Sequence, residues 1–232
     1  MSLWSRIADA VSALAAGESL ATVFDRLRTP PERRVGFAIA VIALGAKMAK
    51  ADGQVTKDEV TAFREVFTIP PDEARNAARV FDLARQDVAG YDAYAKRIAA
   101  MFGAGHSTLV DLMEGLFHIA LADGNYHPKE DDYLANVAKI FGLGEREFRS
   151  LRARFVVDAV QDPYAVLGVA PDAPTDQVRA AWRHAVRESH PDVMMARGVP
   201  EEAMKIAEKR LVDVNRAWEE IVAERGEQAR DG

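Results

Sequence analysis

The sequence predicts an all-α protein. Apolar residues recur at steps of three and four along nearly the whole chain, and no run of useful length alternates apolar with polar residues as a strand would. The periodic runs are separated by Gly53, Gly90, Gly103 to Gly105 and Gly142 to Gly144, which are typical helix stops. With 49% hydrophobic and 28% charged residues, the composition is that of an ordinary globular protein.

The helices expected before the C-terminal region follow these runs. The longest apolar stretch, residues 35–49, is interrupted by Lys47 and is shorter than the roughly 20 residues of a membrane span, so we expect a buried core helix. The expected helices are 2–15, 18–27, 31–51, 57–67, 71–86, 91–102, 107–122, 128–141 and 145–157.

The N-terminal helix has an apolar stripe formed by Leu3, Trp4, Ile7, Val11 and Leu14. No basic region precedes it, so we do not expect a signal peptide. The stripe fits either docking on the body of the protein or peripheral contact with a membrane surface. We favour docking, because the single basic residue of the segment is offset by an acidic one and gives little attraction to anionic lipid.

An internal repeat marks the part of the chain before residue 157. Residues 51–59 align with residues 122–130, and in both copies an apolar helix precedes the acidic turn and an amphipathic helix follows it. One copy alone would leave an apolar face exposed, so we predict a duplicated bundle in which the two copies pack face to face.

The acidic turns of this repeat hold the candidate metal ligands. Asp52 and Glu59 in the first copy, and Asp123 and Glu130 in the second, have the same spacing and could hold calcium or magnesium weakly. The alternative is local: Asp-Gly is a common turn, and the two glutamates sit where helix-capping residues are found. Capping alone is the preferred interpretation, and we expect no other cofactor.

A second group of motifs lies near the C-terminus. The tripeptide His190-Pro191-Asp192 separates a basic helix, in which arginines recur every four residues, from a long helix that begins near Pro200. Proline disfavours helix for the residue before it, so the basic helix should end at His190 and expose the tripeptide. The exposed basic face consists of Arg179, Arg183 and Arg187; the expected core residues are Tyr164, Leu167, Trp182, Leu211 and Trp218.

These motifs resemble the J domain of the DnaJ co-chaperones, and the preceding repeat resembles the TerB-like domain. A TerB-like domain followed by a J domain is similar to the DjlA-type co-chaperones, as is the sequence Arg197-Gly-Val-Pro200 after the tripeptide. Members of that family usually begin with a membrane span, which we do not expect here. The expected divisions are an N-terminal helix (1–19), a TerB-like domain (20–157), a short linker (158–162) and a J domain (163–232).

The resemblance implies a function. A J domain stimulates ATP hydrolysis by a DnaK-type chaperone, which would be contacted by His190, Pro191, Asp192 and the arginine stripe, while the TerB-like domain recruits the chaperone to a protein client. The family often has a basic residue at Val193 and at His184, and a Tyr at Ser189, so this contact surface is thinner. The alternative is a metal-responsive or stress-related scaffold with a weak or vestigial J domain.

Other functions are disfavoured by composition. The net charge is -6, and neither the part before Gln161 nor the part after it has the basic excess of a nucleic-acid binder. There is no cysteine, so disulfides and thiolate chemistry are excluded. We find no nucleotide loop or nucleophile constellation and therefore do not expect an enzyme. A cytoplasmic location is the default expectation.

Overall fold

The computed structural model describes residues 2–29, 32–51, 63–64, 66–86, 90–122, 124–156 and 162–228. Within these ranges the chain forms helices and turns and no strand, which confirms the all-α prediction. The expected helix 57–67 and the linker 158–162 lie largely outside the described residues. None of the helices in the described ranges combines the length and apolarity needed to cross a bilayer.

Two short helices begin the chain. α1 (Leu3–Ala15) and α2 (Leu20–Arg26) each start after a serine, Ser2 and Ser19, whose hydroxyl accepts a hydrogen bond from a backbone amide of the first turn. α1 packs along α5 (Ala74–Gln86) and buries its apolar stripe; the Trp4 side chain is 1% exposed and meets the Phe67 ring edge-on. The N-terminal stripe is therefore docked on the body of the protein.

The centre of the N-terminal region is α3 (Glu32–Ala51), which contacts α1, α5, α6 and α7. Its residues from Phe37 to Leu44 are all nearly inaccessible, as expected for the apolar stretch of the sequence. The other elements of this region are η1 (Pro71–Glu73), α5, α6 (Tyr91–Phe102), α7 (Ser107–Ala120), α8 (Pro128–Ile140) and α9 (Glu145–Phe155).

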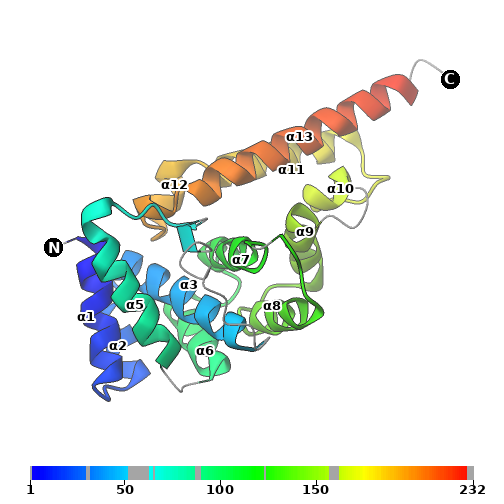
Figure 1. The fold of residues 1–232 in the computed structure, drawn as a ribbon. Coiled ribbons are helices and arrows are strands. Elements are labelled where there is room, and N and C mark those ends of the chain that lie inside the picture. Colours follow the sequence, from blue (N-terminus) through cyan, green and yellow to red (C-terminus); the bar gives the residue numbers. More distant parts are fainter. Residues whose placement is uncertain are drawn as a thin grey trace.

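The C-terminal region is built on a helix hairpin. Its elements are α10 (Pro163–Val166), α11 (Thr175–Glu188), α12 (Pro191–Ala196), η2 (Glu201–Ala203) and α13 (Lys205–Gln228). α11 and α13 lie side by side, with α10 against α13 and α9 (Figure 1). The sequence predicted a helix before the tripeptide and another from about Pro200, but not α12 between them. Pro191 occupies the first position of α12, where its missing amide hydrogen has no cost.

Two hydrophobic cores result, and α13 takes part in both. Its middle and C-terminal turns join a small core with α10 and α11, to which Val214, Ala217 and Ile221 contribute. Its first turns instead join the large N-terminal core through Ile206 and Ala207. The two regions are thus connected by one continuous helix, whose first turns are buried in the large core and whose later turns contribute one face to the small core.

The docking of α1 can be tested by Trp4→Ala. Removal of a fully buried indole should lower the free energy of unfolding by about 3–5 kcal/mol, because the lost apolar contact leaves a cavity between α1 and the body. Urea unfolding followed by circular dichroism measures this change. Val222→Ala, at a position 46% exposed on α13, is the control and should change the value by less than about 0.5 kcal/mol. Equal effects of both substitutions would contradict the docking.

Candidate functional site

The tripeptide lies in the turn between α11 and α12. α11 ends at Glu188, and His190 caps α12, with its Nδ1 accepting a hydrogen bond from the Asp192 amide at 3.2 Å. The imidazole is 61% exposed and the Asp192 carboxylate 82% exposed, and Pro191 between them is also exposed. The turn therefore presents all three side chains to solvent.

The arginine stripe continues from this turn along α11. Arg179, Arg183 and Arg187 are all exposed, one helical turn apart, while Val178 on the opposite face is completely buried. The guanidinium of Arg179 lies 5.9 Å from the centroid of the Trp218 ring. All six residues expected to contact a partner are thus exposed, along α11 and in the turn that follows it.

The expected core residues divide into two groups. Tyr164 and Leu167 are buried in the small core. Trp182 and Trp218 pack against this core, and their rings stack on each other with the centroids 5.2 Å apart. The Trp182 indole also donates a hydrogen bond to Asn215 Oδ1 at 2.9 Å. Leu211 is only partly buried and lies outside this core; its place on α13 is between Ala207, which belongs to the large core, and Val214, which belongs to the small one.

A buried ionic cluster, which the sequence analysis missed, joins the two regions beside the tripeptide. Arg197 donates to both oxygens of Asp111 on α7, at 2.7 and 2.8 Å, and to the Glu188 carboxylate at 2.6 Å. Arg210 on α13 donates to both oxygens of Glu114, at 2.9 and 2.8 Å, and to Asp111 at 2.5 Å. Three arginines face three carboxylates in this cluster, which consists of Asp111, Glu114, Arg154, Glu188, Arg197 and Arg210.

The electrostatics of the cluster depend on desolvation and on the arginines. Burial would raise the pKa of Glu114, but the charges of Arg154 and Arg210 outweigh it and hold that pKa below its ordinary value of 4.5. At Asp111 burial prevails and raises the pKa against the opposing charges of Arg210 and Arg197. A signal for the cluster was present in the sequence, since Asp111 and Glu114 interrupt an otherwise apolar helix.

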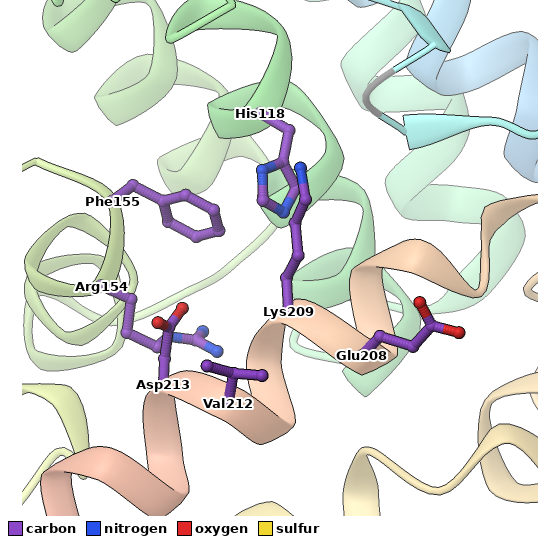
Figure 2. A pocket seen from close by; sticks show the side chains of 7 residues that line it. All are labelled: His118, Arg154, Phe155, Glu208, Lys209, Val212 and Asp213. Carbon is purple, nitrogen blue, oxygen red and sulfur yellow. The ribbon is translucent and has the colours of Figure 1, made fainter.

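A groove of about 370 Å³ opens between the two regions on one side of α13 (Figure 2). His118 and Phe155 form its wall, with their rings in edge-to-face contact at 4.7 Å, and Val212 on α13 faces them. The Asp213 carboxylate lies beside the Arg154 guanidinium in this view, and burial raises the pKa of Asp213 against the charges of Arg216 and Arg154. The residues that line the groove come from α7, α9 and α13.

Of the four candidate metal ligands, Glu130 is among the residues that the structure describes. Asp52, Glu59 and Asp123 lie outside the described residues. Glu130 is 7% exposed, and its carboxylate accepts a hydrogen bond from the His127 amide at 2.9 Å, so it caps α8 as the local interpretation predicts. Among the residues that the structure describes, no three or more His, Asp or Glu side chains form a group suited to a metal ion.

Comparison with known proteins assigns both regions. The family model of tellurite resistance protein TerB matches residues 38–153, and that of the DnaJ domain matches residues 162–227. Co-chaperone protein DjlA of Photobacterium profundum is 27% identical over 221 residues, covering 84% of this chain and 80% of the relative. Co-chaperone protein DjlA of Vibrio cholerae is 27% identical over 227 residues, which cover 84% of this chain and 80% of the relative. Co-chaperone protein DjlA of Coxiella burnetii is 27% identical over 194 residues, which cover 75% of this chain and 72% of the relative. No solved structure matches the chain.

A TerB region followed by a DnaJ domain, in a chain that aligns with DjlA proteins over most of its length, defines the class. The chain belongs to the DjlA-type J-domain co-chaperones. This assignment places it among the co-chaperones rather than the enzymes and implies a DnaK-type partner.

The cluster can be tested by Glu114→Gln. Removing the carboxylate leaves Arg154 and Arg210 with less compensation in a buried site, so the free energy of unfolding at pH 7 should fall by about 3–5 kcal/mol. Because the pKa of Glu114 is lowered by folding, its contribution is present above pH 4.5 and is lost as the pH falls through the folded-state pKa. The difference from wild type, measured by urea unfolding, should therefore shrink in acid.

The control for this substitution is Asp92→Asn, which removes an exposed ion pair with Lys96 on α6. Exposed pairs contribute at most about 1 kcal/mol, so this variant should remain close to wild type at every pH. A Glu114→Gln variant that behaved like Asp92→Asn would show that the cluster does not stabilise the contact between the two regions.

Proposed function

We propose that this protein stimulates ATP hydrolysis by a DnaK-type chaperone through the surface formed by His190, Pro191, Asp192 and the arginine stripe. The observation that carries the proposal is the accessibility of this surface: the tripeptide and the three arginines all face solvent, although the region just beyond them is buried against the N-terminal core. The co-chaperone itself performs no chemistry and acts by changing the conformational equilibrium of its partner.

The chemistry of the surface favours an acidic partner. Planar guanidinium groups form paired hydrogen bonds with carboxylates, and a row of them on the rim of an interface mainly increases the association rate and fixes the orientation. Val193, which is 39% exposed beside the tripeptide, supplies an apolar contact where the family often has a basic residue. We therefore expect weak affinity or a narrow choice of partner.

The TerB region is proposed to recruit the chaperone to a protein client, and we expect no nucleic-acid partner. We also propose that the region arose by duplication. The arrangement that supports duplication is the pairing of α3 with α7, because these two apolar helices precede the two acidic turns and pack against each other. A cytoplasmic location remains our proposal, and the burial of Trp4 and Ile7 argues against membrane contact through the docked α1.

The first test is single-turnover ATP hydrolysis by the DnaK-type chaperone of the same cell. Wild-type protein should accelerate hydrolysis, and His190→Gln should abolish the acceleration, because the exposed imidazole both caps α12 and belongs to the proposed contact surface. Circular dichroism should show the variant to be folded, since the side chain is outside both cores.

A matched control is His127→Gln, which alters an exposed histidine at the start of α8, far along the chain from the tripeptide. It should stimulate hydrolysis as wild type does. If neither wild type nor either variant stimulates hydrolysis, the proposed function is wrong and the alternative of a helical scaffold with a vestigial J domain takes its place.

For the acidic turns we propose capping rather than a metal site. The structural support is the Glu130 carboxylate, which is already engaged by the His127 amide. Titration with calcium in a calorimeter should then give no binding heat. Heat that disappears in the double variant Asp52→Ala, Asp123→Ala would contradict the proposal and assign a weak divalent site to the two turns.

A further inference from the structure

The turn that follows the tripeptide folds on the TerB region rather than on the core of its own domain. Met194 in α12, Val199 and Ala203 have no exposed surface, and all three belong to the large N-terminal core. The small core of the J domain contains no residue of α12. The tripeptide is thus joined to an element whose apolar contacts come from the other domain.

Arg197 holds this element from both sides of the tripeptide. Its side chain reaches back to the last residue of α11, where it donates to the Glu188 carboxylate at 2.6 Å and to the Glu188 carbonyl at 3.0 Å. The same guanidinium is paired with both oxygens of Asp111 on α7. The residues before and after His190-Pro191-Asp192 are therefore fixed to one point of the TerB region.

The backbone at this position fits closely as well. The Thr108 hydroxyl on α7 donates to the Arg197 carbonyl at 3.0 Å. Gly198 has a φ of +103°, which disfavours other residues, and a side chain there would approach the Arg33 Cβ to 3.3 Å. Such contacts determine the orientation of α12, whereas apolar burial alone would permit several.

The exposed residues are left untouched by these contacts. All of the bonds of Arg197 point toward α7 and α11, while the His190 and Asp192 side chains are 61% and 82% exposed. The contact with the TerB region consequently does not cover the surface that we assign to the chaperone.

We infer that the J-domain turn docks on α7 of the TerB region and that Arg197 is a positioning residue, which sets the direction in which the tripeptide meets the ATPase. This inference rests on the proposed function. It gives Arg197-Gly198-Val199-Pro200 a specific role in docking on the TerB region. Arg197 pairs with Asp111 on α7, Gly198 supplies a left-handed backbone position close to Arg33 on α3, and Val199 is buried in the large core.

Arg197→Lys is the informative substitution, because lysine keeps the charge but cannot reproduce the planar fork that joins Asp111 and Glu188. The maximal stimulation of single-turnover ATP hydrolysis should fall by about two- to thirty-fold, as for a substitution that changes coupling without touching the partner. The matched control is Arg28→Lys, whose arginine forms an exposed pair with Asp25 and should leave stimulation unchanged.

A purely stabilising role would give a different result. If Arg197→Lys is folded by circular dichroism at the assay temperature, and its stimulation at saturating concentration equals that of wild type, the positioning role is overturned. The inference is supported if the maximal stimulation of ATP hydrolysis falls. A change confined to the co-chaperone concentration that gives half-maximal stimulation does not support it.

The orientation itself can be measured without the chaperone. The chain has no cysteine, so the pair Lys96→Cys and Val193→Cys, one exposed residue on α6 and one beside the tripeptide, can be spin-labelled specifically. Double electron–electron resonance should give a narrow distribution of the distance between the two labels, and this distribution should broaden when Arg197→Lys is added. An unchanged distribution would overturn the inference even if wild type stimulates hydrolysis. A broadened distribution together with a wild type that does not stimulate hydrolysis would show that Arg197 positions the turn and that the proposed function is wrong.

Discussion

The pairing of Arg197 and Arg210 with Asp111 and Glu114 is the constraint on which the arrangement of the two domains depends. Buried charges are tolerated only when every partner is present, so this contact requires α7, α13 and the turn after α12 at once. Val199 and Ile206, which have no exposed surface, belong to the large core that the same elements join. The cluster thereby selects one relative orientation among the many that apolar packing would accept.

Much of the fold follows from the sequence because its signals are local. Helix ends were predicted to within two residues for α6, α7 and α8, where glycine, serine or proline supplies the stop or start. The surface around the tripeptide was predicted for the same reason: Pro191 ends α11, and the arginine spacing is a property of one helix.

The interdomain contact could not be predicted in this way. Asp111 and Arg197 are far apart in sequence, and a helical pattern shows that a polar residue interrupts an apolar face without identifying its partner. The same limit explains Leu211, which was placed in the J-domain core because the apolar stripe of α13 is continuous. The helix in fact passes from one core to the other, and periodicity carries no information about which core a given turn will meet.

The division of α13 between two cores has a consequence for how such proteins change during evolution. A J domain cut out at residue 162 would take Met194, Val199 and Ile206 with it and expose them, together with two arginines deprived of their carboxylates. Exchange between relatives would therefore succeed only when the recipient offers a matching acidic pair on its α7. The J domain and the acidic pair on α7 should therefore be inherited together, and recombination at residue 162 should be rare.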